Sequence, residues 1–380
     1  MKPRVLIIHA STGNGHLSAA NAVDLALQEL GVETRVIDGL DFAPRAFRTW
    51  YGGGYEATVR MKPELWGWLY KISDDPGFAY HVQTLADSAF LNKLEKEILS
   101  FRPDVVVCTH SLPQPKVAEL REKLPLKMAV VVTDLYPHLM WHRGEPDFFF
   151  LPQDWSYTEL LKRYPAAEGK CMITGIPVNR AFSHALPRAQ AAEAMGLCPT
   201  APTVLLTAGG IGAGDFLGAA EALTTVPDLQ LFVVCGRNDR LYEKLTKHLQ
   251  PGKTKCLRIL KRLPVEEMAK IMHAAHLVVG KPGGLTVSEA LAAGCAFVVH
   301  EPFLIPGQEE DNARFLVERK IGLVTHDNAE LGETVRHLFE SRDEIVKMRA
   351  NALYAGMPGS AMQIATKVLE LATLDTVAAS

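Results

Sequence analysis

Short, uninterrupted runs of apolar and β-branched residues recur along almost the whole chain, separated by longer amphipathic stretches. Runs of this kind are typical of strands in a parallel sheet, because helices cover both faces of such a sheet. The alternation predicts a doubly wound α/β architecture, in which ligands bind at the carboxyl ends of the strands. The expected strands are Val5–His9, Glu33–Ile37, Asp104–Thr109, Met128–Thr133 and Phe148–Leu151 in the first half, and Thr203–Thr207, Leu229–Cys235, Cys256–Leu260, Leu277–Val279 and Ala296–His300 in the second. Between the strands of the first half, helices are expected over Ser18–Leu30, Ala86–Phe101, Gln114–Lys123 and Trp155–Tyr164.

The length of the chain predicts more than one domain. A chain of 380 residues exceeds what a single hydrophobic core usually supports. The stretch Gly175–Ala201 contains several prolines around a short amphipathic segment, a pattern that is typical of a linker. We therefore expect two doubly wound domains, with a cleft between them that would hold two substrates.

Composition and charge exclude several classes of protein. The net charge of −3 argues against a chain-wide nucleic-acid binder. The six cysteines are scattered without a CxxC pair, so buried reduced thiols explain them better than disulfides or zinc. No segment approaches the roughly 20 apolar residues that span a bilayer, and Met1–Ile8 lacks the features of a signal peptide. We expect a cytoplasmic protein that is soluble or peripheral to a membrane.

The loop after the first strand, Ser11–His16, carries the pair Gly13 and Gly15 ahead of a helix. Glycines allow a tight turn and a close approach to a ligand, and the following helix N-terminus favours negative charge. The loop departs from a dinucleotide fingerprint because a histidine stands where a small residue is expected, and a plain structural turn is the alternative. His16 is the more specific signal, because imidazole titrates near neutrality and can remove a hydroxyl proton.

Two further glycine-rich turns follow strands of the second half. Ala208–Asp215 has four glycines ahead of a helix, which favours a diphosphate cradle over a flexible turn. Lys281–Ala290 forms a strand-to-helix turn, with the hydroxyls of Thr286 and Ser288 at the helix start. We expect Glu289 in or near the first helical turn, where it would accept two hydroxyl hydrogens from a ribose. Compensation of the helix dipole is the alternative role for this glutamate.

Polar residues follow two other strands. Pro306–Asn312 places amide and carboxylate groups at a helix start, and such groups match the dense hydroxyls of a hexose, although a solvated acidic helix start is the alternative. Asp134 follows an apolar run and therefore lies at the carboxyl end of its strand. An aspartate there would orient a histidine or act as a base itself, with a simple turn residue as the alternative.

The stretch Phe42–Tyr70 interrupts the α/β rhythm and holds three of the five tryptophans. Aromatic rings interleaved with basic residues suit a bilayer interface and anionic headgroups. A helical insert that packs its aromatic rings onto the first domain is the alternative. The side chains concerned are Trp50, Trp66, Trp68, Tyr51, Tyr55, Tyr70, Arg45, Arg48, Arg60 and Lys62.

These motifs, in this order, resemble glycosyltransferase family 28, and within it the monogalactosyl- and processive glucosyl-diacylglycerol synthases. The likeness covers most of the chain, and six ordered motifs make an accidental match improbable. The motifs that carry it are Gly13-Asn14-Gly15-His16, Thr133-Asp134 with His138 and Trp141, Thr174–Val178, Cys235–Asn238, Lys281–Gly284, and the Gln308-Glu309 pair with Asn312.

The resemblance implies a GT-B fold, with two Rossmann-like doubly wound domains facing a cleft. It assigns the acceptor to residues 1–176, to which a helix over about 360–380 would return, and the nucleotide sugar to residues 177–359. It further implies an inverting, metal-independent transfer of a hexose from a UDP-sugar to a lipid acceptor such as diacylglycerol, with no cofactor. The enzyme would act at the anionic inner face of the cell membrane as a peripheral protein.

Where a motif of this sequence matches one of the family, the resemblance implies the same role for its residues. His16 resembles the acceptor-side catalytic histidine, with Asp134 its neighbour or its competitor for the role of base. Glu289 would hold the ribose, and Gln308 and Glu309 the sugar hydroxyls. Other donor-side residues implied are Gly209, Gly210, Gly212, Arg237, Gly283, Gly284, Thr286 and Asn312, and the acceptor-side or loop residues are Gly13, Asn14, Gly15, His138 and Trp141.

Two departures and three alternatives accompany the resemblance. The family carries an arginine directly after the Gly175–Val178 box, where this chain has Asn179 and then Arg180, and Asn14 replaces a glycine of the plant-type galactolipid enzymes. A UDP-N-acetylglucosamine-type epimerase, or an N-acetylglucosamine transferase of the same fold with another acceptor, would share the nucleotide contacts. A dinucleotide-dependent oxidoreductase would use Asp38 as its ribose-binding acid, but the imperfect first fingerprint argues against it. The donor stays open among glucose, galactose and N-acetylglucosamine.

Overall fold

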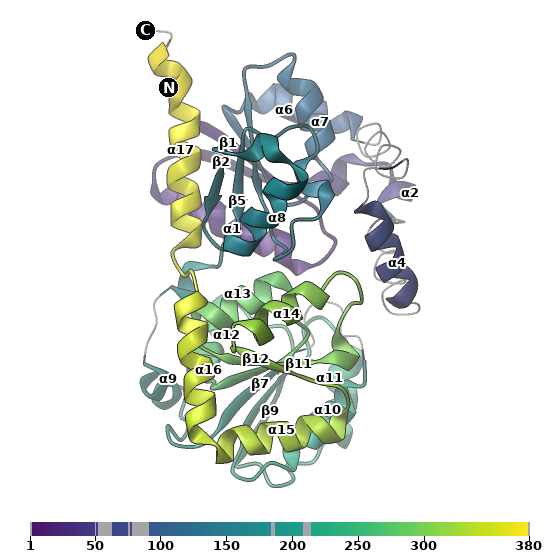
Figure 1. Ribbon diagram of the computed structural model, residues 1–380, viewed down its shortest axis with the longest axis vertical. Helices are drawn as coiled ribbons and strands as arrows, with labels where there is room; N and C mark the ends of the chain where they lie inside the picture. The colour runs from purple at the N-terminus through teal and green to yellow at the C-terminus, as the bar shows by residue number, and fades with distance from the viewer. Residues whose placement is uncertain are drawn as a thin grey trace. The chain divides into compact units, whose positions relative to one another are not determined.

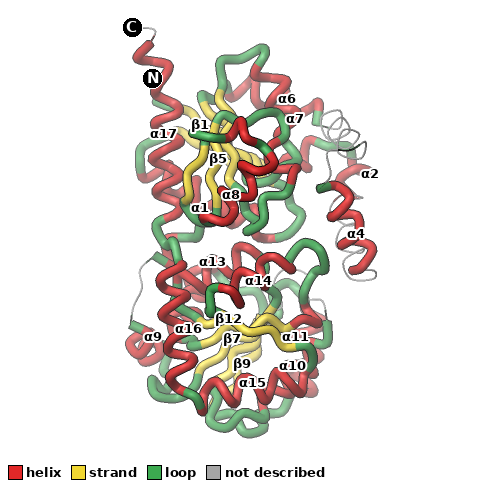
Figure 2. The backbone as a smooth tube through the Cα atoms, viewed as in Figure 1, coloured by secondary structure: helices red, strands yellow, loops and turns green. Residues whose placement is uncertain are grey.

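The computed structural model describes residues 2–49, 51, 63–74, 77, 91–183, 187–207 and 214–378 (Figure 1). The chain divides into two compact units, of which unit 1 comprises Met1–Asn179 and Pro358–Ser380 and unit 2 comprises Arg180–Met357. Each unit is built around a six-stranded sheet whose strands all pair in parallel. Figure 2 shows the strands of each unit enclosed by helices. The predicted doubly wound architecture is therefore confirmed.

The sheet of unit 1 has the strand order β2-β1-β3-β4-β5-β6. Its central strands β1 and β3 consist mostly of valine, isoleucine and leucine and are buried on both faces, as parallel strands under helices must be. The order reverses between β1 and β3, so the chain segments that leave these two strands diverge there. The strands are β1 (Arg4–His9), β2 (Glu33–Asp38), β3 (Val105–Cys108), β4 (Lys127–Val131), β5 (Phe148–Leu151) and β6 (Cys171–Ile173).

Helices cover both faces of this sheet, and a separate hydrophobic core lies between the helices and the sheet on each face. Val23 of α1 and Val368 of α17 share one core with Val107 of β3, whereas Val117 of α7 packs on the opposite face with Val106. The last helix thus returns to unit 1, and its first residue Ser360 is fully buried where its hydroxyl donates to the carbonyl of Ile176 at 3.2 Å. The helices in the described part of unit 1 are α1 (Asn14–Glu29), α2 (Arg45–Arg48), α4 (Pro63–Ser73), α6 (Asn92–Phe101), α7 (Gln114–Arg121), α8 (Asp154–Arg163) and α17 (Ser360–Ala378).

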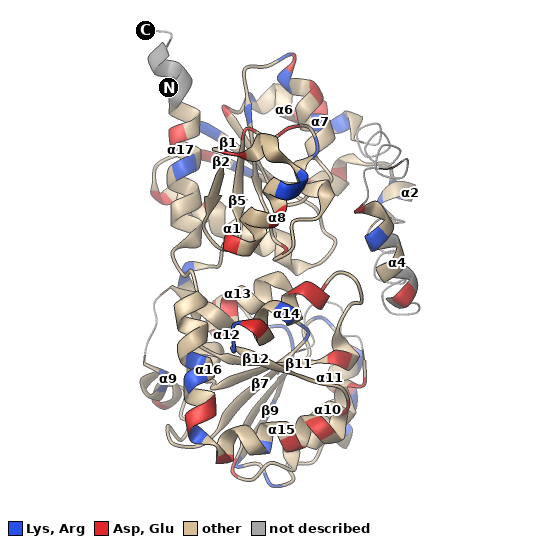
Figure 3. Cartoon of the chain, in the orientation of Figure 1, with Lys and Arg blue, Asp and Glu red and all other residues tan. Residues whose placement is uncertain are grey.

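The sheet of unit 2 has the order β12-β11-β10-β7-β8-β9 and reverses between β7 and β10. Both acidic and basic residues are carried by its helix α16 (Figure 3), as on a solvated surface. Its strands are β7 (Thr203–Thr207), β8 (Gln230–Val234), β9 (Cys256–Leu260), β10 (Leu277–Gly280), β11 (Ala296–His300) and β12 (Gly322–Thr325); its helices are α9 (Arg188–Ala194), α10 (Phe216–Thr224), α11 (Asp239–His248), α12 (Val265–Ala274), α13 (Gly284–Ala292), α14 (Glu310–Glu318), α15 (Asn328–Glu340) and α16 (Arg342–Ala355).

Three details differ from the sequence-based expectation. Strands β6 and β12 were not predicted, because they are only three and four residues long and partly exposed. Helix α1 begins at Asn14 rather than Ser18, since Gly13, with φ of 140°, ends the loop and directly precedes the helix. The expected helix over 86–101 is described only from Asn92 onward, and its earlier residues lie outside the described part of the chain.

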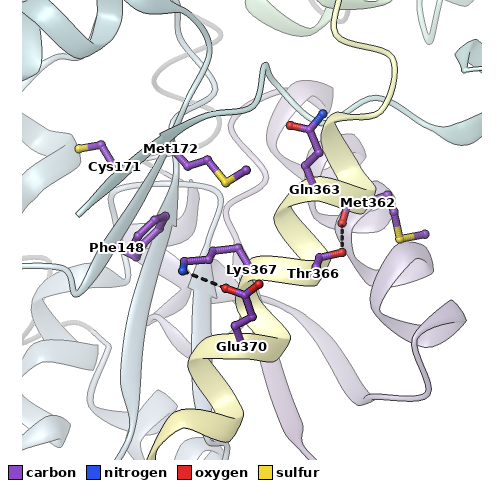
Figure 4. Close-up of a pocket in the computed structure, with 8 residues that line it drawn as sticks. All are labelled: Phe148, Cys171, Met172, Met362, Gln363, Thr366, Lys367 and Glu370. Carbon is purple, nitrogen blue, oxygen red and sulfur yellow. Dashed lines mark hydrogen bonds and ion pairs between the residues drawn. The ribbon is translucent and has the colours of Figure 1, made fainter. Parts of the chain in front are cut away.

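A groove of about 440 Å³ lies between α17 and the start of strands β5 and β6 (Figure 4). Lys367 spans it, pairing with Glu370 at 2.9 Å and lying 5.2 Å from the centre of the Phe148 ring. Phe148 and Cys171 are the first residues of their strands, so the groove is at the amino-terminal edge of the sheet. Ligands of doubly wound sheets bind at the opposite, carboxyl edge, so this groove is not the candidate site.

Candidate active site

The sequence-predicted loop Gly13–His16 of unit 1 lies at the point where the strand order of its sheet reverses. The chain leaves β1 through the loop to α1, and leaves β3 through residues 109–113 to α7. Because α1 and α7 lie on opposite faces of the sheet, the two loops diverge and leave room between them for a ligand. His16, in the first turn of α1, and His110, two residues beyond β3, both lie there, with their ring centroids 4.5 Å apart.

Two contacts fix the tautomer of His16. Its Nδ1 lies 2.9 Å from the carbonyl oxygen of Thr109 and 2.9 Å from the hydroxyl oxygen of Thr133. A carbonyl oxygen only accepts hydrogen bonds, so Nδ1 carries the hydrogen and Nε2 carries the lone pair. No hydrogen bond from the described part of the chain engages Nε2. The ring is therefore held in the orientation and tautomer of a base.

The same surroundings keep His16 neutral. The pKa of the imidazole is lowered to about 4, mainly because burial disfavours its charged form; the hydrogen bond to Thr109 acts in the opposite direction, and His9 adds a smaller lowering effect. At neutral pH the ring is therefore unprotonated, and Nε2 can accept a proton from a hydroxyl group.

The other acceptor-side residues follow β4. Asp134 is half-buried, and the indole Nε1 of Trp141 donates to its Oδ2 at 3.3 Å. The Trp141 ring lies 6.4 Å from that of His16, so it forms part of the same site. His138 is fully buried and does not contact His16. Its Nε2 lies 3.1 Å from the carbonyl oxygen of Tyr70, so it connects the loop after β4 to helix α4.

Sequence reasoning missed the groups that orient His16. It considered Asp134 for that role, whereas the Nδ1 hydrogen is already held by Thr109 and Thr133. Thr109 also donates from its hydroxyl to the main-chain carbonyl of His16 at 3.0 Å. Each threonine is the last residue of an expected strand, and Thr133 belongs to one of the family motifs, but neither fact indicates a contact with His16. Asn14 and Gly15, expected in the loop, belong to the first turn of α1, and Gly13 alone keeps a backbone conformation that favours glycine.

In unit 2 the two expected glycine-rich turns follow β7 and β10, the strands at which this sheet reverses, whereas Arg237 follows β8 and the Pro306–Asn312 box follows β11. Gly209, Gly210 and Gly212 lie outside the described residues. The chain is described again from Gly214, whose φ is +90° and where a Cβ would come within 2.5 Å of the carbonyl oxygen of Pro302. Only glycine fits this approach. Arg237 lies exposed in the turn between β8 and α11.

Helix α13 begins directly after the Lys281–Gly283 turn at the carboxyl end of β10. Gly283 caps this helix, Gly284 is its first residue and Thr286 its third. Glu289 is the sixth residue, so it lies in the second turn rather than the first. Its side chain is partly buried, and desolvation raises the pKa of the carboxyl group to about 8. Without a ligand to accept from, Glu289 is therefore mainly protonated at neutral pH.

We expect the affinity for UDP to increase as the pH rises from 6.5 to 8.5. If the ribose hydroxyls donate to the Glu289 carboxylate, binding requires the proton to leave, and this loss is costly below a pKa of about 8. The dissociation constant measured by calorimetry should fall on the order of tenfold over this range. In Glu289→Gln the affinity for UDP should no longer change with pH in this way. If the wild-type affinity changes with pH no more than that of the variant, Glu289 does not bind the ribose.

The predicted hexose box is joined to the β10 turn by buried polar contacts. Glu309 is 3% exposed, and its Oε1 accepts from Lys281 Nζ at 2.5 Å while its Oε2 accepts from the Ile305 amide at 2.9 Å. Asn312 is also buried, and its amide nitrogen donates to the carbonyl of Pro282 at 2.8 Å. Both oxygens of Glu309 are thus engaged within the protein, and Lys281, to which the sequence analysis gave no role, is the cation that this carboxylate positions.

Known proteins match both halves of the chain. The family model "Monogalactosyldiacylglycerol (MGDG) synthase" matches residues 16–178, and "Glycosyltransferase family 28 C-terminal domain" matches residues 203–370. The processive diacylglycerol beta-glucosyltransferase of Bacillus licheniformis is 26% identical, over 96% of this chain and 94% of that protein. Among solved structures, Acinetobacter baumannii MurG has a TM-score of 0.64 at 15% identity, over 97% and 99% of the two chains. The UDP-GlcNAc 2-epimerase of Neisseria meningitidis has a TM-score of 0.62 at 14% identity, over 97% and 100%.

Two doubly wound units, each with candidate residues at the carboxyl ends of its strands, together with these matches define a glycosyltransferase of the GT-B fold. The two family models leave only short segments of the chain unmatched. The chain belongs to glycosyltransferase family 28, as its sequence motifs indicated. Among the described residues, no group of three or more histidine, cysteine, aspartate or glutamate side chains is arranged to hold a metal ion.

Proposed function

We propose that this glycosyltransferase moves a hexose from a UDP-sugar to the hydroxyl group of diacylglycerol, with inversion at the anomeric carbon. The observation that carries the proposal is the geometry of His16, a neutral imidazole whose Nδ1 hydrogen is held by protein oxygens and whose Nε2 lone pair has no protein partner among the described residues. The lipid acceptor and the sugar nucleotide are supported by relatives named for glucosyl transfer to diacylglycerol and by the family 28 match.

In this mechanism Nε2 of His16 takes the proton of the acceptor hydroxyl as its oxygen attacks the anomeric carbon. The new bond forms on the face opposite the diphosphate, and the bond between that carbon and the diphosphate oxygen breaks, so UDP leaves with the electron pair. The Thr109 carbonyl stabilises the imidazolium, because its hydrogen bond to Nδ1 strengthens when the ring becomes charged. Amides at the start of α13 and the Lys281 ammonium would stabilise the charge on the departing diphosphate.

The enzyme would meet its lipid at the inner face of the cell membrane as a peripheral protein. None of the helices in the described ranges combines the length and apolar character that a membrane crossing needs. Helix α4 carries Trp68 and Ile72 exposed and four residues apart, hence on one face, with exposed Lys71 beside them. This supports membrane contact through the Phe42–Tyr70 stretch. Within that stretch Trp50, Tyr55, Arg60, Lys62 and the side chain of Trp66 lie outside the described residues.

Replacing Trp68 and Ile72 with serine should weaken binding to anionic vesicles by at least about tenfold, because each apolar side chain contributes on the order of 1.5 kcal/mol or more when buried. Co-sedimentation with vesicles measures the effect. Val346→Ser on α16 is the matched control, since Val346 is 62% exposed but belongs to unit 2. Equal loss in the control would show that α4 has no special role.

The direct test is UDP release from each common UDP-hexose, with and without diacylglycerol in anionic vesicles. We expect release to require both one particular donor and the lipid. Release that is independent of the lipid, or conversion of the donor sugar into its epimer, would overturn the proposal and favour the epimerase that shares this fold.

A further inference from the structure

The ring beside the candidate base belongs to a second histidine, His110. The two rings meet edge to face at an interplanar angle of 75°. The main-chain amide of Leu112 donates to Nδ1 of His110 at 3.0 Å, so Nδ1 carries the lone pair. A neutral ring then carries its hydrogen on Nε2. No hydrogen bond from the described part of the chain engages this Nε2–H.

The two histidines therefore have opposite tautomers. Nε2 of His16 is a hydrogen-bond acceptor, whereas Nε2 of His110 is a donor, and both nitrogens are without protein partners among the described residues. Burial is the main reason that the pKa of His110 lies well below its usual value, and the charge of Arg143, or of His16 if it were protonated, acts in the same direction. Both rings stay neutral at physiological pH, so the pairing of one acceptor with one donor persists.

The pair lies within a row of aromatic side chains. The ring of Tyr51 is 6.3 Å from that of His110, which is followed by His16 at 4.5 Å and then by Trp141 at 6.4 Å. Tyr51 belongs to the stretch expected to meet lipid, and Trp141 donates to Asp134. His110 thus lies between the base and that stretch, on the side from which a lipid acceptor would come.

We propose that His110 is a second acceptor-binding residue, whose Nε2–H donates to an oxygen on the carbon next to the attacking hydroxyl. Two rings in contact can serve two oxygens only if these oxygens are close together, as they are on adjacent carbons. Diacylglycerol has this arrangement, because an ester oxygen stands on the carbon beside the one that carries its hydroxyl. The two histidines would therefore select a glycerol derivative over a simple long-chain alcohol. The inference rests on the proposed transfer to diacylglycerol and adds a determinant of acceptor specificity.

The test compares two acceptors and two variants in the full-length enzyme. The acceptors are 1,2-diacylglycerol and a long-chain primary alcohol in the same anionic vesicles, and the readout is kcat/KM from UDP release. His110→Phe keeps a flat ring but removes the donor, and we expect about a tenfold loss with diacylglycerol and little change with the alcohol. His110→Gln restores an N–H donor and should recover most of the loss.

Equal losses for the two acceptors in His110→Phe, with no recovery in His110→Gln, would show that His110 only packs against His16 and would overturn the inference. So would a wild-type enzyme that uses the alcohol as well as diacylglycerol. The affinity for UDP should be the same in both variants and the wild type, which verifies that unit 2 is intact. Failure of the proposed function is distinct from these outcomes, because wild-type enzyme would then release no UDP in response to diacylglycerol.

Discussion

His16→Ala is expected to lower kcat by about 10²- to 10⁴-fold, the usual contribution of a general base. The variant loses the Nε2 lone pair that takes the hydroxyl proton, while the strands and helices around it need not move, because the His16 ring is only partly buried. Steady-state UDP release in the presence of diacylglycerol measures the effect. The dissociation constant for UDP should stay unchanged, since the residues expected to bind UDP belong to unit 2.

The pH dependence of the wild-type enzyme tests the same assignment. A base with a pKa of about 4 is unprotonated throughout the neutral range, so kcat at saturating UDP-sugar should be lost only as the pH falls through that value, well below the usual pKa of histidine. Thr133→Val removes one acceptor from Nδ1 and should cause a smaller loss than His16→Ala. Wild-type turnover in His16→Ala together with inactivity of Asp134→Asn would instead identify Asp134 as the base.

The strands were predictable because a strand that is buried on both faces must consist almost entirely of apolar residues. Every residue of β3 and β7 is buried, and the corresponding runs contain almost nothing but apolar and β-branched side chains. Strand β6 failed this criterion because it lies at the edge of its sheet and is three residues long. The start of α1 was misplaced because polar Asn14 and Gly15 resemble a loop, although helical backbone begins there.

Residues of the candidate site were predictable only where a local motif indicates both the position and the chemical role of a side chain. His16 and Glu289 stand beside glycine turns that follow strands, so their positions follow from the doubly wound fold. The contacts that decide their behaviour join distant parts of the chain and leave no local pattern. The Nδ1 atom of His16 meets residues 93 and 117 positions away, and Glu309 meets Lys281 across 28 positions. Tautomer, pKa and ion pairing therefore became visible only in three dimensions.

The ion pair between Lys281 and Glu309 should have the largest effect on stability. Their side chains are 15% and 4% exposed, so removal of either partner leaves a charge in a site with little access to water. We expect Glu309→Ala to lower the free energy of unfolding by about 3–5 kcal/mol, whereas an exposed pair would contribute less than about 1 kcal/mol. Denaturant unfolding of the full chain measures the change.

A double-mutant cycle separates this role from a direct contact with the sugar. Lys281→Met combined with Glu309→Gln removes both charges, so the double variant should be more stable than the sum of the single losses predicts. Gln308→Ala is the matched control, because Gln308 is only partly buried and belongs to the same box. It should raise KM for the UDP-sugar with little loss of stability. If Glu309→Ala behaves like this control, Glu309 contacts the hexose as the family resemblance implies; if it destabilises strongly, its main task is to hold Lys281 in place for the diphosphate.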